Sequence, residues 1–490
     1  MVDSDDPKRG ELNLLRRELK YLESLGSRPT GSPAHQALVE DIAIKLTAMG
    51  LEVRRDPHRF TRWIAAQDDH HVRLTIGGID VEVASPFPYS GVTGPAGIAG
   101  QLQLVSGCWT GWWRARDKIA VLEVPHVAFP SDLIVSHWAE SSPVKVVSHP
   151  LLSAAAYGPK LDQARKAGVM AIVVVWRGLS AENAAKQYIP VNEPYHDIPA
   201  LWVAGKAGER VLSAARRGEK AALVLDASLT SDSITETIWA VSPGRRANET
   251  ILLVTHTDGV NAVQENGHIG LLELARTVTS RPHERTIVFV FTTGHLRIPA
   301  VTARGQATSA WLDAHPELWK GGPGQERAVG GLVLEHLGAR GYLDDPVRGY
   351  VPTEAPEREL LYATTQLLHD LLLREWRGAY PEAPHVSKPS ALIQLGEGEP
   401  LYQRNIPCVS LVTAPQYLFA ETDKDIVDIE VMRRQIDSFR RLLVYFEAMP
   451  AEAFGSVRQA SVWSKLFAIA RFLLTRELLR RSRDARQETA

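Results

Sequence analysis

The spacing of apolar residues in the second half of the chain predicts an α/β fold. Short apolar runs alternate with longer segments whose apolar residues recur at helical spacing, and turn-forming residues flank each run. Runs of this kind are typical of buried strands in a sheet that helices cover on both faces. Four of them predict the core strands of a main sheet: ETILLVTHTDG (249–259), RTIVFVFTTGH (285–295), AVGGLVLEHLG (328–338) and IPCVSLVT (406–413).

The first half of the chain predicts two helices and then a separate α/β unit. The helical spacing covers ELNLLRRELKYLESLG (11–26) and SPAHQALVEDIAIKLTAMG (32–50), and both segments end in Gly, which suits the left-handed residue after a helix. A stretch rich in Pro and Gly (86–100) predicts a domain boundary. Beyond it, a strand, helix, strand alternation continues to about Ala227 and predicts an inserted α/β domain.

These patterns divide the chain into four predicted parts. Residues 12–95 form the first portion of the main domain, residues 96–230 the insert, and residues 231–450 the rest of the main domain. Residues 451–490 form a basic, amphipathic C-terminal helix or tail, which is too interrupted by charge to span a bilayer. This helix could lie on a membrane surface, contact another subunit or pack on its own chain.

Composition and charge narrow the class of protein. The 490 residues carry a formal net charge of −2 with both signs interspersed, whereas a nucleic-acid-binding protein shows a basic face or stripe. The two cysteines, Cys108 and Cys408, lie far apart and predict neither a disulfide framework nor a cysteine zinc site. The segment MVDSDDPKRGELNLL lacks the pattern of a secretory signal, so we expect a cytoplasmic protein.

Polar side chains follow the predicted core strands at the point where each strand ends. Ligands of open α/β sheets bind outside the carboxyl ends of the strands, so these residues are the candidates for chemistry. Two histidines and two glutamates among them make a nitrogen and oxygen ligand set that suits zinc or a similar divalent ion. The strand-end and turn residues are His256, Asp258, Glu265, His295, Glu335 and His336.

The order of these motifs over residues 12–450 resembles the zinc aminopeptidase family (peptidase family M-28), which includes leucyl aminopeptidases, glutamate carboxypeptidase and glutaminyl cyclases. The motifs are GSRPTGSP (26–33), the His-x-Asp strand end, the Glu-Asn-Gly turn before LLELA, and the RTIVFVF strand. The insert resembles a protease-associated domain through PKLDQARKAGVMAIVVVW and IPALWVAGKAGERVL. The resemblance implies a three-layer mixed sheet of the zinc exopeptidase type with a smaller α/β insert.

Several residues match the metal-binding positions of that family. His256 matches the first metal ligand, and Asp258 matches the carboxylate that orients this histidine without touching the metal. Glu265 stands where the family has its bridging Asp, and Glu335 stands where it has the terminal Asp ligand of the same metal. The resemblance therefore implies one zinc ion held by His256, Glu265 and Glu335.

The positions for a second metal depart from the family pattern. Gly294 and His295 replace the Glu-Glu pair that supplies the general base and a ligand, and Leu418 replaces the last His ligand. Glu397 replaces the Asp of the usual Ser-Asp-His segment. A two-zinc mechanism needs two ions and a carboxylate base near their shared water, so a standard aminopeptidase is not expected.

Three functions are compatible with this sequence. The first is an atypical aminopeptidase-like metallohydrolase that cleaves a peptide or small amide with one zinc, His295 serving as base or fourth ligand; Glu397, Glu399 or His268 are alternative bases. The second is a non-catalytic relative that binds a peptide or partner through the cleft that holds the active site in the family. The third is a metal-free enzyme that uses His295 with Glu265 or Glu335 as an acid and base pair. The first is favoured because the substituted positions keep metal-binding residue types.

Overall fold

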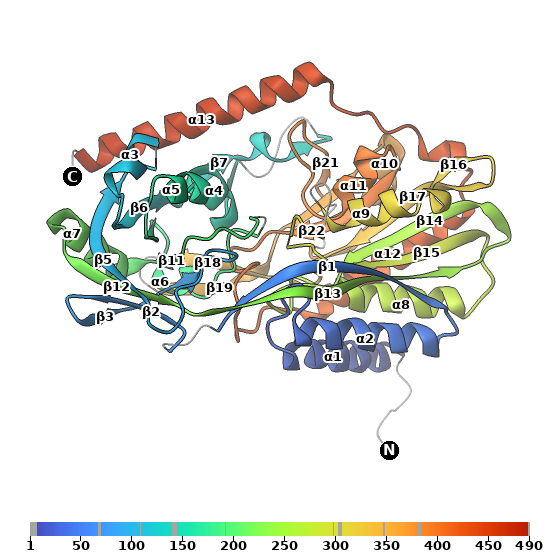
Figure 1. Cartoon of the computed structure of the whole chain (residues 1–490). Helices are drawn as coiled ribbons and strands as arrows, with labels where there is room; N and C mark the ends of the chain where they lie inside the picture. Colours follow the sequence, from blue (N-terminus) through green and yellow to red (C-terminus); the bar gives the residue numbers. More distant parts are fainter. Residues whose placement is uncertain are drawn as a thin grey trace.

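The computed structural model describes residues 7–66, 70–107, 109–139, 145–191, 193–296, 298–301, 306–345, 348–380, 382 and 384–488. Two large β-sheets lie next to each other along the molecule, and a long C-terminal helix runs across one side (Figure 1). The candidate site belongs to the larger of the two sheets.

The larger sheet has ten strands, and the four predicted core strands are its centre. These four, β15, β14, β17 and β22, are consecutive neighbours and pair in parallel, so their carboxyl ends meet at one edge. The fold prediction for them is confirmed. The order across the sheet is β1 (Val53–Ala65), β13 (Ala227–Ser242), β15 (Arg285–Thr292), β14 (Arg246–His256), β17 (Gln325–Leu334), β22 (Cys408–Thr413), β20 (Glu359–Ala363), β21 (Val386–Lys388) and β8 (Ser136–His137), with β16 (Lys320–Gly322) beside β17.

Helices cover both faces of this sheet, which makes the predicted three-layer arrangement. Side chains that alternate along β14 point to opposite cores: Leu253 packs in the core of one face and Leu252 in the core of the other. The first face carries α1 (Pro7–Ser24), α2 (Pro33–Ala48), α8 (Gly267–Thr279), α10 (Gln366–Glu375) and α12 (Ile429–Ala448). The second carries α9 (Ala307–Ala314) and α11 (Gly398–Gln403).

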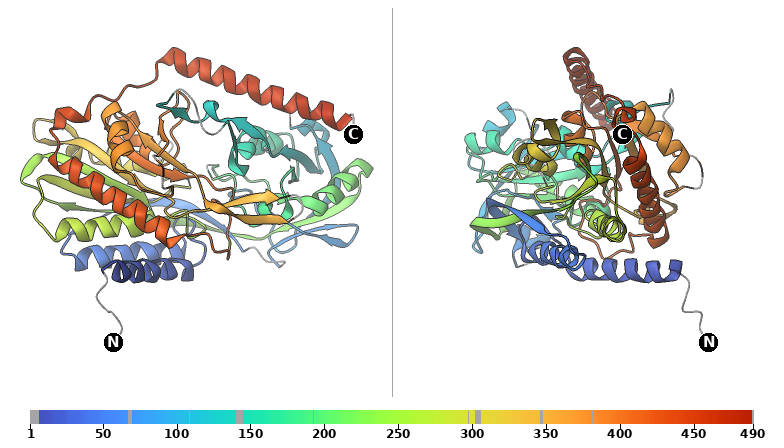
Figure 2. Two further views of the ribbon diagram at one scale, coloured as in Figure 1. Left: turned by 180° about the vertical axis from the view of Figure 1, so that it is seen from behind. Right: turned by 90° about the vertical axis from the view of Figure 1, so that its right-hand side faces the viewer.

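The two N-terminal helices form where the sequence predicts them. The Ser32 hydroxyl accepts a hydrogen bond from the His35 N–H at 3.1 Å and so caps α2, whose first residue is a proline. Gly26 and Gly50, which follow the two helices, have φ angles of 67° and 82°. Both helices pack against α8 (Figure 2), and the loop between them reaches the edge of the sheet where the strands end.

The smaller sheet has eight strands and shares its core with the larger one. Its strand order is β3 (Ile79–Val81), β2 (Val72–Ile76), β12 (Lys220–Leu225), β5 (Ile98–Val105), β6 (Ile119–Pro125), β10 (Ala171–Arg177), β11 (Ala200–Val203) and β4 (Ser85–Pro86). Helix α7 (Gly205–Arg217) packs on one face, while the other face joins the core of the larger sheet. The remaining helices here are α3 (Trp109–Arg114), α4 (Pro150–Tyr157), α5 (Leu161–Lys166) and α6 (Ala181–Ala184).

Strand pairing does not follow the predicted division at residue 96. Strands β2, β3 and β4 precede that residue, yet they belong to the smaller sheet together with the strands that follow it. The Pro- and Gly-rich stretch 86–100 connects two strands of this one sheet, because turn-forming residues mark any change of chain direction, whether or not it separates domains.

A long two-stranded ribbon joins the two sheets. Strands β1 and β13 pair antiparallel from Val53 opposite Ala240 to Ala65 opposite Ala227. At one end β13 also pairs with β15 of the larger sheet, and at the other it begins just after β12 of the smaller sheet (Figure 1).

The other elements lie around this frame. Two small ribbons pair β7 (Ala128–Pro130) with β9 (Val146–Ser148) and β18 (Arg340–Asp345) with β19 (Gly349–Pro356), and the C-terminal helix is α13 (Val462–Glu488). Within the described residues, no helix is both long and apolar enough to cross a membrane. Cys408 is a free, buried thiol, and Cys108 lies outside the described residues.

Candidate metal centre

Four side chains from the carboxyl ends of three neighbouring strands meet at one point. His256 ends β14, His295 lies in the turn after β15, and Glu335 and His336 follow β17 directly. Each offers one nitrogen or oxygen atom, and these four atoms lie within 4.8 Å of one another. All four side chains are buried, so the edge of the parallel sheet holds a compact, water-poor cluster.

The orientation of His256 leaves one ring nitrogen without a partner. Its Nδ1 lies 3.0 Å from the main-chain oxygen of Asp258, so Nδ1 carries the proton and donates it to that oxygen. Nε2 therefore bears a lone pair, is buried, and has no hydrogen-bond partner among the described residues. It lies 3.5 Å from Glu335 Oε2, which likewise lacks a partner. Two lone-pair atoms this close repel each other unless a proton or a cation lies between them.

His336 adds a third buried atom of the same kind. Its Nδ1 lies 2.8 Å from the main-chain oxygen of Thr413, and its Nε2 has no partner in the described part of the chain. The backbone at His336 has a φ of 54°, a left-handed conformation that side chains other than Gly adopt at a cost. This turn lets Glu335 and His336, which would point to opposite faces of a regular strand, reach the same cluster.

His295 is backed by a second glutamate. Its Nδ1 donates a hydrogen bond of 2.6 Å to Glu397 Oε1, and its ring stacks on His256 with the centroids 3.5 Å apart. Glu397 also accepts hydrogen bonds from the main-chain N–H groups of Ala307 and Thr308 at the start of α9. Its own N–H donates to Glu335 Oε1 at 2.7 Å. One network thus fixes both the glutamate of the cluster and the histidine beside it.

Burial and neighbouring charges set the protonation of the cluster. Burial lowers the pKa of His256 well below its usual range and that of His336 to about 3, and the nearby histidines add to both shifts. Burial opposes a charge on His295, but the hydrogen bond and the charge of Glu397 outweigh it, so the pKa of His295 is raised. Burial raises the pKa of Glu335 to about 8. A cluster with neutral His256 and His336 has its ring lone pairs ready for a cation.

Glu265 lies outside this cluster and forms an ion pair with Arg28. Both side chains are fully buried, and the Arg28 guanidinium contacts Glu265 Oε1. Arg28 also donates to the main-chain oxygen of Leu22 at 2.9 Å, which ties the end of α1 to the turn before α8. Burial raises the pKa of Glu265 to about 7, although the charge of Arg28 opposes this shift. The role of Glu265 as a metal ligand stays a prediction, since its carboxylate is not among the four converging groups.

Asp258 supports the site through different atoms from those expected. Its main-chain oxygen, and not its carboxylate, accepts the hydrogen bond from His256 Nδ1. The carboxylate instead accepts from the Thr30 hydroxyl at 2.6 Å and from the N–H groups of His295 and Leu296, each at 3.2 Å. Asp258 therefore positions the turn that carries His295 as well as the ring of His256.

The other candidate bases lie away from the four groups. The Nδ1 of His268 lies 2.7 Å from the main-chain oxygen of Glu265 in the first turn of α8, where burial lowers its pKa to about 3. Glu399 accepts a hydrogen bond from the main-chain N–H of Gln394 at 3.3 Å. Of the three alternative bases, Glu397 is the one that touches a cluster residue.

An apolar chamber opens beside the cluster. Its volume is about 210 Å³, and His295 and His336 form part of its wall. Helix α4 and the residues just before it close one side, while the strand ends and the segment 393–396 close the other. The apolar lining residues are Val147, Leu151, Leu152, Ala155, Val191, Ile393, Leu395, Val412, Ala414, Leu418 and Phe419.

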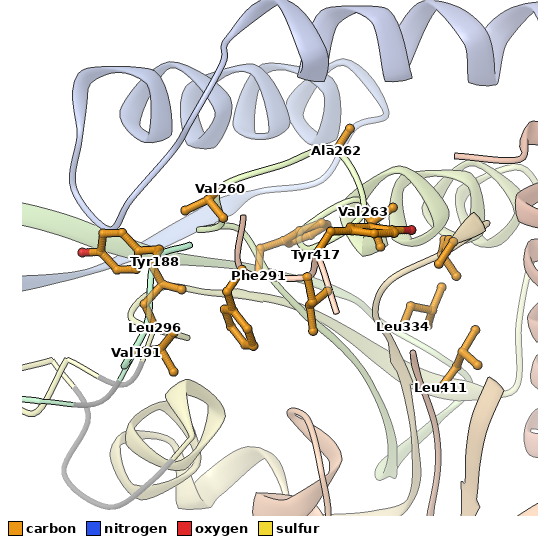
Figure 3. Packing of buried hydrophobic residues seen from close by; sticks show 14 of the residues in the cluster. Tyr188, Val191, Val260, Ala262, Val263, Phe291, Leu296, Leu334, Leu411 and Tyr417 are labelled. Atoms are coloured by element: carbon orange, nitrogen blue, oxygen red, sulfur yellow. The ribbon is translucent and has the colours of Figure 1, made fainter. Parts of the chain in front are cut away.

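Apolar packing holds the strand ends rigid around the cluster. Figure 3 shows Leu334 and Leu411, from β17 and β22, near Val263 in the turn before α8. Tyr188 and Val191, which come from the segment after α6, lie in the same layer beside Leu296. Since this layer draws on both halves of the molecule, the smaller sheet helps to fix the site.

Sequence reasoning found most of these residues and missed two relationships. His256, His295 and Glu335 come together as the strand ends predict, but His336 was not assigned to the ligand set, because adjacent residues of a strand normally face opposite ways. Arg28 was visible in the GSRPTGSP motif, but its partner was not, since the pair spans 237 positions of sequence. A buried arginine needs a carboxylate or carbonyl partner. If Arg28 is assumed to be buried, this requirement predicts that an acidic residue elsewhere in the chain pairs with it.

Comparison with known proteins identifies the fold. No protein-family model matches this chain, and no curated protein matches it in sequence. Solved structures do match over nearly the full length. An aminopeptidase from Aneurinibacillus sp. strain AM-1 is 15% identical, with a TM-score of 0.59 over 93% of this chain and 97% of that one.

Two further structures agree with this match. A zinc aminopeptidase from Bacillus subtilis is 14% identical, with a TM-score of 0.58 over 91% of this chain and 98% of its own. A peptidase M-28 precursor from Shewanella amazonensis is 13% identical, with a TM-score of 0.59 over 94% of this chain and 100% of its own. This chain therefore has the M-28-like zinc exopeptidase fold, as the resemblance in sequence implied.

The converging atoms fit a metal ion. His256 Nε2, His336 Nε2 and Glu335 Oε2 are buried and have no partner in the part of the chain that the structure describes, and buried polar atoms are otherwise almost always hydrogen-bonded. Two histidine nitrogens and one glutamate oxygen are a ligand set of catalytic zinc sites.

Proposed function

We propose that this protein is an atypical aminopeptidase-like metallohydrolase with a single zinc ion held by His256, Glu335 and His336. The observation that carries the proposal is the convergence of their three buried, unpartnered atoms at the carboxyl edge of the sheet. Relative to the set expected from sequence, His336 takes the place of Glu265. Three protein ligands leave a position open for water or substrate, which a catalytic zinc requires and a structural zinc does not.

When bound, zinc supplies Lewis acidity that polarises a carbonyl group and makes water a stronger nucleophile. The chain itself supplies the proton transfer. His295 donates through Nδ1 to Glu397, so its Nε2 is the atom that accepts a proton from water and returns it to the leaving amine. Glu397 acts as a positioning residue, because its two bonds from the start of α9 fix the carboxylate that orients the imidazole.

The chamber favours a substrate with an apolar group next to the scissile bond. A peptide or small amide that places its carbonyl at the cluster would lie beside His295 and His336, with its apolar part among the aliphatic residues of the wall. Because the lining of the chamber is mostly aliphatic, a charged group there would lose hydration without a partner.

We also propose that the smaller sheet and its helices correspond to a protease-associated domain. The motifs PKLDQARKAGVMAIVVVW and IPALWVAGKAGERVL fall on α5 with β10 and on β11 with α7, and β10 and β11 are parallel neighbours in the smaller sheet. Residues of this region, including Leu151 and Val191, line the chamber, so this domain would contribute to substrate selection.

The test is the metal content of the purified protein, measured by plasma mass spectrometry. We expect about one zinc per chain in the parent and loss of zinc in His256→Ala, His336→Ala and Glu335→Gln. His283→Gln is the matched control, because His283 is also buried but lies outside the cluster. Absence of zinc from the parent after incubation with Zn²⁺ would refute the proposal. Glu265→Gln tests the prediction that Glu265 is a zinc ligand. Loss of zinc in this variant would support that role.

A second candidate function is binding without hydrolysis. It is favoured by the loss of the Glu-Glu pair, where this chain has Gly294 and His295. A panel of aminoacyl and acyl amides separates the two functions: turnover that disappears in His295→Ala supports the hydrolase. Zinc-loaded protein that binds peptides and turns none of them over supports the binding function.

A further inference from the structure

Helix α13 has one face packed on the protein. Phe472 stacks on Phe129 with the ring centroids 5.7 Å apart, and Leu479 packs in the same apolar cluster. The Tyr157 hydroxyl donates to the main-chain oxygen of Arg476 at 2.8 Å, and Arg471 pairs with Asp132 at 2.5 Å. The helix is therefore held at a fixed place on the surface, as Figure 1 shows along its upper side.

The rest of the helix surface carries exposed apolar side chains, and two of them, Trp463 and Phe467, also border a hollow between the helix and the residues 132–136 and 390–392. Trp463 is 80% exposed and Phe467 is 72% exposed, and Leu474 and Leu478 continue the row at helical spacing. Eight of the seventeen exposed large apolar side chains among the described residues lie on this one helix. They are Val462, Trp463, Leu466, Phe467, Ile469, Leu473, Leu474 and Leu478. Seventeen residues of helix span about 25 Å, so the row is a continuous strip and not a scatter of single side chains.

The charge of the helix differs in sign from that of the rest of the chain. Residues 462–488 contain seven Lys and Arg and three Asp and Glu, a net charge of +4. The whole chain carries −2, so the other residues carry −6. The helix therefore brings an apolar strip with basic residues to the surface of an otherwise acidic protein.

We propose that α13 binds the surface of an anionic lipid bilayer, lying in its plane with the exposed strip among the headgroups and the upper acyl chains. A helix with an apolar strip, an aromatic residue and basic residues has the composition of interfacial helices. Electrostatic attraction between the basic residues of the helix and anionic headgroups strengthens such binding.

Other partners for this strip fit less well. The rest of the chain already occupies the inner face of the helix, and no described helix is long and apolar enough to cross the bilayer. A second copy packed strip to strip would bring two helices of net charge +4 together, which like-charge repulsion disfavours.

Vesicle flotation with the full-length protein tests the proposal. We expect the protein to float with vesicles of phosphatidylcholine containing phosphatidylglycerol, and to bind vesicles of phosphatidylcholine alone at least tenfold more weakly. Raising the salt concentration should weaken the binding, because it screens the attraction. The triple variant Trp463→Ser, Phe467→Ser, Leu474→Ser should bind the anionic vesicles at least tenfold more weakly than the parent.

A matched variant controls for the loss of exposed apolar surface in general. Ile44→Ser, Ile79→Ser, Val444→Ser removes three exposed apolar side chains that lie outside α13, and it should bind vesicles like the parent. Lys465→Gln, Arg480→Gln, Arg481→Gln should bind anionic vesicles more weakly while keeping the apolar strip. Far-ultraviolet circular dichroism should give all variants the parent's helix content.

Three outcomes would overturn the proposal. The first is a parent protein that does not float with anionic vesicles. The second is a strip variant that floats as well as the parent. The third is a dimer that sedimentation detects in the parent and not in the strip variant, with lipid binding absent from both. The last result would assign the strip to a second copy of the chain.

Discussion

The buried pair of Arg28 and Glu265 shows how a single contact can link remote parts of this protein. The arginine belongs to the loop between the first two helices, and the glutamate belongs to the turn between β14 and α8. Because both charges are removed from water, each offsets the free-energy cost of burying the other.

Removing one partner of this pair should cost more than removing both. Arg28→Met leaves Glu265 as an unpaired buried carboxylate and should lower the free energy of unfolding by about 3–5 kcal/mol. Arg28→Met combined with Glu265→Met should recover part of that loss, because neither partner then leaves the other as an unpaired buried charge. Urea unfolding of the two single variants and the double variant measures the coupling; strictly additive losses would contradict it.

Gly396 should be required for the position of Glu335. Its φ is 81°, and a Cβ atom there would lie 2.5 Å from Glu335 Oε1. Gly396→Ala should therefore lose zinc as well as about 1–2 kcal/mol of stability from the left-handed backbone. Gly78→Ala is the matched control, because Gly78 has a φ of 80° with nothing within 4 Å of the added atom. It should lose similar stability and keep its zinc; equal zinc contents would count against the prediction.

Glu397 should shift the pH dependence of turnover through His295. Glu397 raises the pKa of His295, and a histidine that accepts a proton works only above its pKa. Glu397→Gln should therefore move the acidic limb of the kcat/KM profile to lower pH and reduce the plateau. Glu399→Gln, at a carboxylate that accepts a hydrogen bond from the Gln394 N–H, should leave the limb in place. A limb that stays fixed in Glu397→Gln would exclude this role.

At the level of elements, the start of α4 joins the smaller sheet to the chamber through a histidine cap. His149 Nδ1 accepts a hydrogen bond from the Leu151 N–H at 3.0 Å, and Nε2 lies 3.0 Å from the main-chain oxygen of Pro415. Only the neutral ring can accept at Nδ1 and donate at Nε2, and burial lowers the pKa of His149 to about 4.

This cap should make the protein sensitive to acid. The pKa of His149 is lower in the folded chain than the usual value of 6.5, so its stabilising effect is complete above pH 6.5 and is lost as the pH falls towards 4. Between pH 7.5 and pH 5 the loss from this residue should be about 2 kcal/mol. His149→Asn keeps a capping side chain that does not titrate, so the difference in unfolding free energy between parent and variant should change with pH by that amount. A difference independent of pH would contradict the prediction.

The elements themselves were largely predictable from sequence, and the reason is periodicity. The strands β14, β15, β17 and β22 are unbroken apolar runs because both faces of the sheet are covered, and α1 and α2 carry apolar residues at helical spacing. Strand-end position then predicted that His256, His295 and Glu335 would approach one another.

What the sequence did not reveal depends on contacts between distant residues. The inclusion of His336 depends on one left-handed residue, and the isolation of Glu265 depends on Arg28. Strands β2, β3 and β4 belong to the smaller sheet because they pair with its strands. The local sequence of a strand does not indicate with which sheet it will pair.

At the scale of the whole molecule, the larger and smaller sheets act as one structural unit around the site. Their cores are continuous, and the chamber takes its walls from both. Helix α13 runs along the outside of this unit (Figure 2), so binding to a membrane through its exposed side chains would leave the core packing unchanged while fixing how the protein faces the lipid.

The ribbon of β1 and β13 has a consequence for how the chain folds. Ala65 and Ala227 lie directly opposite each other, so the smaller sheet with its helices occupies the place of a hairpin turn. Closing a loop of this length carries a large entropic cost, and β1 and β13 cannot easily pair while residues 66–226 are unfolded. Once that region is folded, it holds Ala65 next to Ala227. The hydrogen bonds between β1 and β13 can then form in order from Ala65 towards Val53. We therefore expect the smaller sheet to fold before β1 and β13 pair at the edge of the larger sheet.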